Sequence, residues 1–341
     1  MDSRRTLHLA NVFFEEELAD KSPFSFQAIK KNPVYLQLQF LPLLYAKAED
    51  GIAVTAIPEG MQAHFHRLDG PISHYAQVDS WGASMAVAQW AQKHKLSYDI
   101  PPIDCVRTVN SKAFSYLEGK KLKNSALLYT TQEVLLWIDS FSGPKLLKTC
   151  FGVAGKGNLL IDERTNREKM LRFLELEWNA HRPVIGEPWV KRRLDFSTQW
   201  MIGKNKEIDF VGATLCENDE RGRHVGNCVG NEKKLFRDNY LFLEMQKEES
   251  LPVLAKMAEL GYFGHVGIDA MVYEGETSAL HPIVEINARK TMGWVALKML
   301  EKKPGQSFSL RYDRCHEGGL LPSSLEGVQF PRNIFTINIA T

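Results

Sequence analysis

The run HPIVEINAR, in the last quarter of the sequence, alternates apolar and polar side chains in the manner of a strand. Since successive side chains of a strand point to opposite faces, Glu285, Asn287 and Arg289 share one face and their apolar neighbours share the other. The residues alone are equally compatible with an ordinary strand whose polar side lies in solvent. The alternative is a binding strand, because glutamate and asparagine oxygens suit Mg²⁺ and an arginine fork suits phosphate or carboxylate.

The stretch HVGIDAMVYEGE lies just before this strand and places Asp269 within a second apolar run. A turn around Glu274 and Gly275 would join the two runs as a hairpin, so that Asp269 and Glu285 become cross-strand neighbours. A lone aspartate in an apolar strand is usually a satisfied structural group. Two facing carboxylates repel, however, unless a cation or a proton lies between them, which favours a metal site.

The stretch KTCFGVAGKGNLLI combines lysines with a glycine-rich loop between two strand-like runs. Gly152, Gly155 and Gly157 would let backbone amides turn toward an anion, and Lys148 and Lys156 add positive charge. The order of glycines fits neither a Walker A loop nor a dinucleotide fingerprint, both of which open a helix. The pattern indicates a hairpin that closes over phosphates, with a plain glycine-rich hairpin turn as the equal alternative.

Bulk properties place the chain among globular proteins, since 44% of its residues are hydrophobic and 24% are charged. A net charge of +1 gives no reason to expect nucleic acid or a membrane surface as a partner. The five cysteines form no CxxC pair, so neither a disulfide framework nor a zinc site is indicated. The N-terminal stretch lacks the apolar core of a signal peptide, and we expect a cytoplasmic protein.

The order of patterns predicts two kinds of architecture. The first third alternates strands and helices as a small α/β domain with parallel strands, which ends near Pro101 and Pro102. The remainder groups strands with strands, which indicates an α+β part. We expect strands at 6–9, 52–57, 134–138, 145–149, 159–161, 184–190, 197–202, 208–216, 265–273, 282–287 and 334–339. We expect helices at 34–47 with a bend at Pro42, and at 81–94, 112–117, 165–180, 238–260 and 292–301. Asn110 and Ser111, Thr165, and Thr291 are the expected caps of the third, fourth and sixth helices, and Pro252 is a point that can split the fifth.

Taken in order, the segments VNSKAF, KTCFGVAGKGN, EPWV, GIDAMVY and VEINAR resemble the ATP-grasp superfamily, in particular its carboxylate–amine ligases. The resemblance covers about residues 106–301. It implies a pre-ATP-grasp α/β domain over residues 1–105 and a two-lobed ATP-grasp domain over 106–341, with lobe one at about 106–188 and lobe two at about 189–341.

The resemblance also implies the site. Two lysines would hold the ATP phosphates, the glycine loop would cover them, and backbone atoms after Glu187 would receive adenine. The implied cofactor-binding residues are Lys112, Lys148, Gly152, Gly155, Lys156, Gly157, Glu187, Trp189, Val190 and Asp195, the last at the ribose. The implied metal ligands are Asp269, Glu285 and Asn287, and the implied catalytic residues are Arg289 and Lys148. Asp269 departs from the glutamate that many members carry at this position.

The activity that the resemblance implies is an ATP-dependent ligation of a carboxylate to an amine through an acyl phosphate, with release of ADP and phosphate. The implied cofactors are ATP and Mg²⁺, with Mn²⁺ as an alternative metal. Small-molecule carboxylates and amines would be the partners, and a homodimer is compatible with the resemblance. Two other hypotheses are compatible with the sequence: a non-catalytic ATP-binding module and a phosphotransferase that acts on a small molecule.

Overall fold

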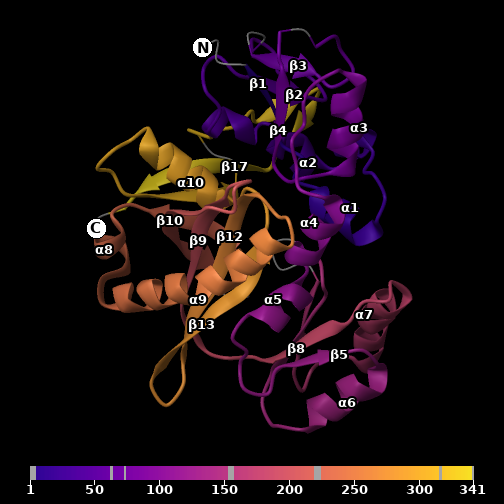
Figure 1. Ribbon diagram of the computed structural model, residues 1–341, viewed down its shortest axis with the longest axis vertical. Coiled ribbons are helices and arrows are strands. Elements are labelled where there is room, and N and C mark those ends of the chain that lie inside the picture. Colours follow the sequence, from indigo (N-terminus) through magenta and orange to yellow (C-terminus); the bar gives the residue numbers. More distant parts are fainter. Residues whose placement is uncertain are drawn as a thin grey trace.

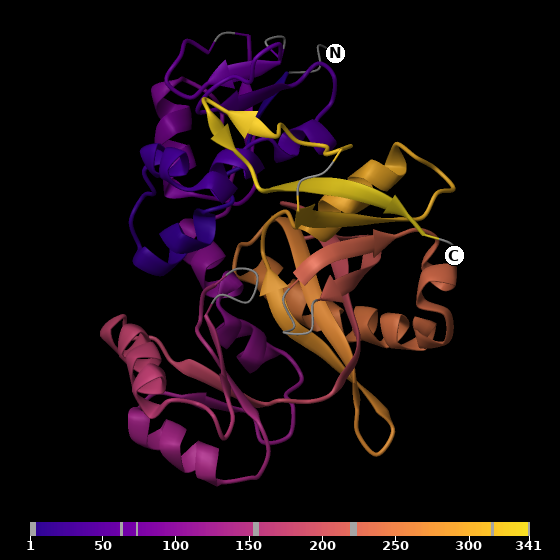
Figure 2. The same ribbon diagram turned by 180° about the vertical axis from the view of Figure 1, so that it is seen from behind.

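The computed structural model describes residues 5–61, 64–72, 74–152, 157–218, 224–314 and 317–339. Figures 1 and 2 show three bodies: an N-terminal α/β body, a small lobe that contains α6 and α7, and a larger lobe built on a long antiparallel sheet. The larger lobe lies between the other two, so that the N-terminal body and the small lobe meet mainly through α4 and α5.

The N-terminal body is a parallel four-stranded sheet with strand order β3-β2-β1-β4, as expected for an α/β domain. Leu7, Leu9 and Val54 fill its interior because their side chains point from the strands into the surrounding helices. The elements are β1 (Thr6–Leu9), α1 (Phe14–Asp20), η1 (Phe26–Lys31), α2 (Pro33–Leu38), η2 (Leu41–Leu44), β2 (Gly51–Val54), β3 (Phe65–Arg67), β4 (Gln77–Ser80) and α3 (Met85–Lys93).

The small lobe is an antiparallel sheet with strand order β5-β8-β6-β7, covered by two helices. Val134, Leu147 and Leu174 are fully buried between the sheet and these helices. The elements, with the two helices that lead into the lobe, are α4 (Ile103–Asn110), α5 (Lys112–Glu118), β5 (Ala126–Leu128), α6 (Thr131–Asp139), β6 (Lys145–Lys148), β7 (Asn158–Ile161), α7 (Arg167–Asn179) and β8 (Val184–Pro188).

The large lobe contains a seven-stranded antiparallel sheet with strand order β13-β12-β9-β10-β11-β14-β17. Helix α9 covers one face, where Leu243 packs with Phe196 and Ala270, and α10 packs on the other. The elements are β9 (Arg192–Ile202), β10 (Ile208–Asn218), β11 (His224–Val229), α8 (Glu232–Phe236), η3 (Arg237–Asn239), α9 (Tyr240–Glu259), β12 (Gly264–Glu274), β13 (Ser278–Asn287), α10 (Met292–Glu301), β14 (Phe308–Arg314), β15 (Ser324–Leu325), β16 (Val328–Gln329) and β17 (Arg332–Asn338).

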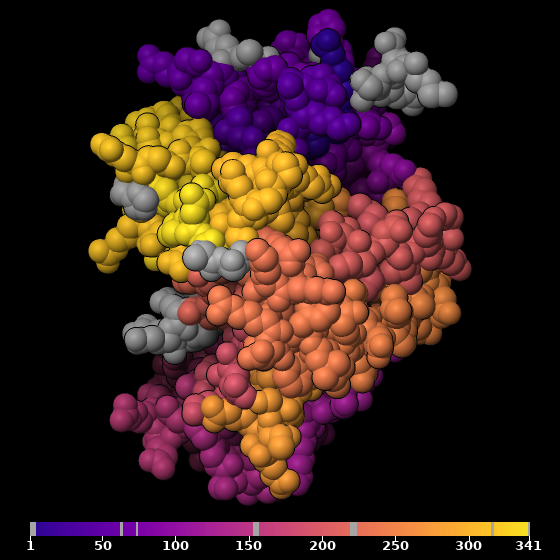
Figure 3. Space-filling model, turned by 90° about the vertical axis from the view of Figure 1, so that its left-hand side faces the viewer, coloured from indigo at the N-terminus to yellow at the C-terminus, as the bar shows by residue number. Residues whose placement is uncertain are grey.

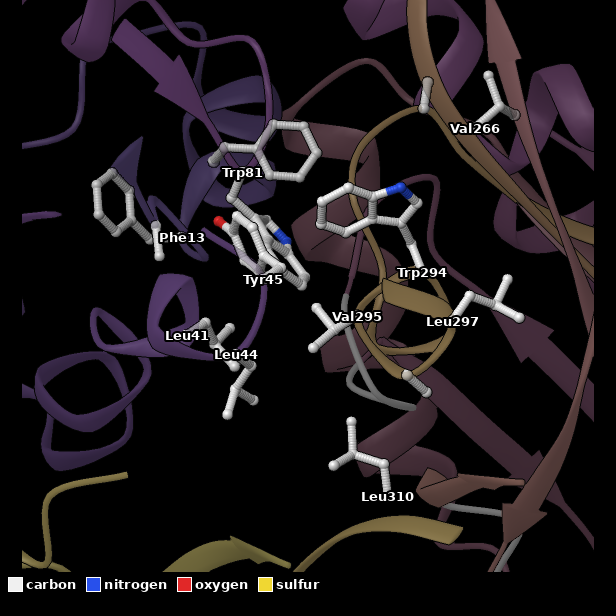
Figure 4. Packing of buried hydrophobic residues seen from close by; sticks show 14 of the residues in the cluster. Phe13, Leu41, Leu44, Tyr45, Trp81, Val266, Trp294, Val295, Leu297 and Leu310 are labelled. Atoms are coloured by element: carbon white, nitrogen blue, oxygen red, sulfur yellow. The ribbon is translucent and has the colours of Figure 1, made fainter. Parts of the chain in front are cut away.

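One hydrophobic cluster joins the N-terminal body to the large lobe. Tyr45 and Trp81 of the N-terminal body pack toward Trp294 and Val295 of α10 (Figure 4). The ring centroids of Tyr45 and Trp294 are 4.9 Å apart in an edge-to-face arrangement. The C-terminal segment, yellow in Figure 3, also lies between the two bodies. The helix that follows the β13 strand is therefore anchored in a core shared by both bodies.

One of the expected strands is wrong. Residues 134–138 lie within helix α6, because the side chain of Thr130 caps the amide of Glu133 and the apolar run continues as one helical face. The split at Pro252 does not occur: helix α9 continues through this proline, because Val253 and Leu254, which follow it, are buried in the main hydrophobic cluster and hold the helix.

Helix α7 also begins later than expected, with Asn166 rather than Thr165 as its cap.

Among the described residues, no helix combines the length and the apolar character that crossing a bilayer requires.

Candidate active site

Strands β12 and β13 bring the predicted metal ligands together. Asp269 is the cross-strand partner of Glu285, and Gly267 is the partner of Asn287. The Asn287 side-chain amide donates to Asp269 Oδ2 at 3.1 Å. Because these positions alternate along the strands, all three polar side chains lie on the face opposite to Phe196 and α9.

An irregularity in the hairpin sets this pairing. Near the turn Glu274 pairs with Ser278, and pairing continued from there would place Ile283 opposite Asp269. The register shifts between Asp269 and Met271, and Glu285 takes that place instead. Pro282 lies in the shifted segment and cannot donate to the ladder, which is the usual reason for a bulge at such a position.

The two carboxylates make the pair suitable for a cation. Burial, and then the neighbouring Glu285 carboxylate, raise the pKa of Asp269 to about 6. Two carboxylates and one amide are hard oxygen donors, which suit Mg²⁺ better than a softer metal. Within the described ranges no three His, Cys, Asp or Glu side chains gather as a metal group. The donor set thus fits an ion that completes its shell with phosphate oxygens and water.

Lys112 stands beside these carboxylates at the first position of α5, which begins there because Ser111 accepts from the amide of Ala113. The Lys112 Nζ lies 2.8 Å from Glu285 Oε1 and donates to the Gly152 carbonyl at 2.9 Å. Burial works to lower the pKa of Lys112, but the carboxylates of Glu285 and Glu15 outweigh it and raise that pKa. Lys112 is therefore a buried, charged group that connects the Glu285 carboxylate to Gly152 at the start of the glycine loop.

Lys148 approaches from the small lobe at the end of β6, where its Nζ lies 2.6 Å from Glu187 Oε2 of β8. Both side chains are buried. They line a pocket between the lobes together with Lys112 and His281. The cavity holds only about 10 Å³, space for roughly one water molecule, because the internal ion pairs fill it.

The glycine loop connects β6 and β7 as an antiparallel hairpin, in which Lys148 pairs with Asn158. Gly157 has φ of 87°, and a Cβ there would lie 2.2 Å from Thr149 Oγ1. Only glycine fits this position at the base of the loop. Gly152, also with positive φ, begins the loop, whereas Gly155 and Lys156 lie outside the described residues.

The segment after β8 crosses from one lobe to the other. The backbone amide of Trp189 donates to the Pro144 carbonyl at 2.9 Å, so this amide already has a hydrogen-bond partner within the protein. Val190 is half-buried, and the Trp189 ring is partly exposed beside Arg192. Asp195 accepts from Arg192 at 2.9 Å and from Asn218 at 2.8 Å. It lies on the same face as Asp269, two strand positions along from Ser197.

Arg289 follows β13 and reaches the N-terminal body. Its NH2 donates to Asn287 Oδ1 at 2.8 Å, and its Nε donates to Glu15 Oε1 at 2.8 Å. The sequence patterns gave no sign of Glu15, which lies in a run of three glutamates at the start of α1. They also missed His281, which lines the pocket and whose pKa is lowered to about 4, mainly by burial.

The described side chains thus form one site from three bodies. Carboxylates and an amide of the large lobe face two buried lysines, one of them carried by the small lobe, and an arginine paired with the N-terminal body. Two lobes that meet over lysines, a glycine hairpin and paired acidic strands form the arrangement that the sequence patterns predict.

Comparison with known proteins supports this architecture at the level of the fold. No family model matches the sequence, and no curated protein is significantly similar to it. An N5-carboxyaminoimidazole synthetase from Staphylococcus aureus, solved with ADP, is similar with a TM-score of 0.53 and 12% identity over 91% of this chain and 82% of that one. A protein assigned to the ATP-grasp superfamily from Archaeoglobus fulgidus has a TM-score of 0.51 and 11% identity over 98% of this chain and all of that one.

The biotin carboxylase domain dimer of a 2-oxoglutarate carboxylase from Hydrogenobacter thermophilus, in complex with MgADP and bicarbonate, has a TM-score of 0.50 and 14% identity. The match covers 74% of this chain and 67% of that one. The chain therefore has the ATP-grasp fold, preceded by a small N-terminal α/β body, as the sequence patterns predict.

Proposed function

We propose that the chain is an ATP-dependent ligase that joins a carboxylate to an amine and releases ADP and phosphate. The observation that carries the proposal is the pairing of Asp269 with Glu285, on the face that meets the buried Lys112. A binding module without turnover has no need of two adjacent carboxylates, because their repulsion is useful only where a cation bridges them to phosphates.

The nucleotide would lie between the lobes. Two similar structures were solved in complex with ADP and MgADP, which supports this placement. Lys112 and Lys148 would exchange their carboxylate partners for phosphate oxygens. The Glu187 carboxylate would then be free to accept a hydrogen bond from the ribose or from the base of the nucleotide. The β6–β7 loop would cover the phosphates, and the backbone around Val190 would meet adenine.

Asp269, Glu285 and Asn287 would hold Mg²⁺, which when bound neutralises phosphate charge. In the first step a carboxylate oxygen of the substrate forms a bond to the γ-phosphorus, and the bond from that phosphorus to the β-phosphate oxygen breaks to release ADP. In the second step the amine nitrogen bonds to the acyl carbon, phosphate leaves with the bonding pair, and the amine proton passes to solvent or phosphate.

The chain's own residues serve these steps through position and charge. The two lysines hold phosphate oxygens in line, and Arg289 lies where it can bind the acyl phosphate. Closure of the glycine hairpin excludes water, which would otherwise hydrolyse that intermediate.

The reaction class is tested by incubating the purified full chain with Mg-ATP and pools of carboxylates and amines. ADP and phosphate should appear only when both substrates are present. AMP with pyrophosphate would contradict the acyl-phosphate route. A stable phosphorylated product would identify a phosphotransferase, and ATP binding without turnover would identify a binding module.

Lys148 has a matched control three residues away on the same strand. Lys145 is equally buried, but its Nζ contacts the Gly143 carbonyl and the Phe141 ring rather than the pocket. Lys148→Met should lower the rate by at least about a hundredfold, because it removes charge at the phosphates. Lys145→Met should change stability and leave the rate per folded molecule close to wild type. Equal losses in both variants would contradict the site.

A further inference from the structure

Glu15 brings a buried carboxylate from the N-terminal body into the candidate site. Its Oε1 accepts from Arg289 Nε at 2.8 Å and lies 2.8 Å from Arg289 NH2. Both side chains are about nine-tenths buried. Glu15 also lies close enough to Lys112 to raise the pKa of that lysine. One carboxylate thus faces two of the cations that the proposed reaction needs.

The neighbouring glutamates of the same helix have other partners. Glu16 accepts from the Tyr35 hydroxyl at the surface, and Glu17 accepts from Ser84 Oγ and from the first amides of α3. The Phe14 ring lies against Arg289 and against Gly82, where a Cβ would come within 2.7 Å of the ring. Tight packing therefore holds the start of α1, and Glu15 can leave Arg289 only by turning its side chain.

The edge of Arg289 that contacts Glu15 is the one a substrate would use. Nε and NH2 form the fork that binds a carboxylate or a phosphate through two parallel bonds. Here Nε donates to one oxygen of Glu15, which also lies 2.8 Å from NH2, and NH2 donates to Asn287. The other cations of the site are satisfied in the same way, Lys112 by Glu285 and Lys148 by Glu187. An incoming anion must therefore displace an internal carboxylate at each point.

We infer that Glu15 is an internal substitute for the acyl group of the substrate: it neutralises Arg289 until a substrate carboxylate or acyl phosphate displaces it. The inference rests on the proposed ligase function. Its consequence is that Glu15 lowers the apparent affinity for that anion, since the protein binds it only in the fraction of molecules whose Arg289 has been released. Removing the charge of Glu15 should thus improve binding, whereas loss of a merely structural contact would weaken it.

The experiment is a calorimetric titration of the full chain, first with MgADP and then, at saturating MgADP, with acetyl phosphate as the probe. Glu15→Gln keeps the shape and one acceptor but removes the charge. We expect the Kd of acetyl phosphate to fall roughly tenfold in Glu15→Gln, the change expected if about a tenth of wild-type molecules are competent. Glu16→Gln, with the same charge change on the same turn, should leave this Kd at the wild-type value.

Glu15→Asp provides a second route if Glu15→Gln does not fold. It retains the charge but is one methylene shorter, so it should hold Arg289 less well and lower the Kd at least threefold. An unchanged or higher Kd in a folded Glu15 variant would overturn the inference while leaving the ligase proposal intact. Failure of the wild-type chain to bind MgADP in the first titration would instead contradict the proposed function.

Discussion

Asp269 is a residue of the candidate site whose ionised form lowers the stability of the fold. Its pKa is raised to about 6 by burial and by Glu285, whereas an unfolded aspartate titrates near 3.8. A raised folded-state pKa stabilises the fold at low pH and costs stability once the pH rises through 6. At pH 7.5 the ionised Asp269 should therefore cost up to about 3 kcal/mol.

Asp269→Asn should accordingly raise the free energy of unfolding of the ligand-free chain at pH 7.5 and abolish Mg²⁺-dependent release of ADP. The gain should shrink as the pH falls below 6 and be mostly lost near pH 4, where folded Asp269 is protonated and the unfolded aspartate is close to half protonated. Denaturant unfolding at the two pH values measures it. A variant that is less stable than wild type at pH 7.5 would show that Asp269 is a satisfied structural group.

Two buried histidines set the acid limit of the fold. Burial lowers the pKa of His265 to about 3 and, as its main cause, that of His281 to about 4. Their unfolded forms take up a proton near pH 6.5, so stability is fully present above that value and declines as the pH falls toward the folded-state pKa values. We expect a loss of about 2 kcal/mol per histidine between pH 6.5 and 5.

The variant His265→Gln should remove its share of this pH dependence. His265 is suitable because its Nδ1 is buried beside Trp294 and has no hydrogen-bond partner among the residues that the structure describes. Unfolding free energies of wild type and variant should converge as the pH falls from 7 to 5. Parallel curves over this range would show that His265 is not a source of acid sensitivity.

At the scale of elements, the β6–β7 hairpin depends on glycine at its base. Gly157→Ala combines a positive φ with a clash against Thr149, while Gly143→Ala, in the bend just before β6, has a φ of 94° and open space around it. Both variants should lose about 1 kcal/mol or more to backbone strain. Only Gly157→Ala should also raise the KM for ATP, as steady-state kinetics would reveal. Equal KM values in the two variants would separate this hairpin from nucleotide binding.

The helices and strands also show which features of the fold can be predicted from sequence patterns. Caps such as Ser111 and Thr291, and the alternation around Asp269 and Glu285, depend on neighbours along the chain and were predicted correctly. Helix α6 was missed because a short apolar run fits a strand and a buried helix equally well. The bulge at Pro282 that places Glu285 opposite Asp269 depends on tertiary packing, so the facing pair was predicted without its cause.

At the scale of the whole molecule, the N-terminal body and the large lobe share one core, and Glu15 reaches Arg289 across 274 positions of sequence. No local pattern encodes a contact of that span, which is why the sequence indicated Arg289 but not its partner. The boundary predicted at residue 105 remains a prediction. The shared core indicates that these two bodies unfold together.

Trp294→Ala tests that coupling. Trp294 is 6% exposed and contacts Tyr45 of the other body, so the variant should lose about 3–5 kcal/mol. Calorimetry should show the transition that includes both bodies moving to a lower temperature as a unit. Two separate transitions, with only that of the large lobe displaced, would show that the bodies are independent.

We propose that Asp269 and Glu285 hold a divalent cation against the phosphates of a nucleotide bound between the lobes. A crystal structure of the full chain with ADP and Mn²⁺, with the metal located by its anomalous scattering, tests it most directly. We expect a metal peak in contact with oxygens of Asp269, Glu285 and ADP, with Lys148 released from Glu187 and placed on a phosphate. Nucleotide bound outside the pocket between Lys112 and Lys148, or a metal peak away from both carboxylates, would contradict it.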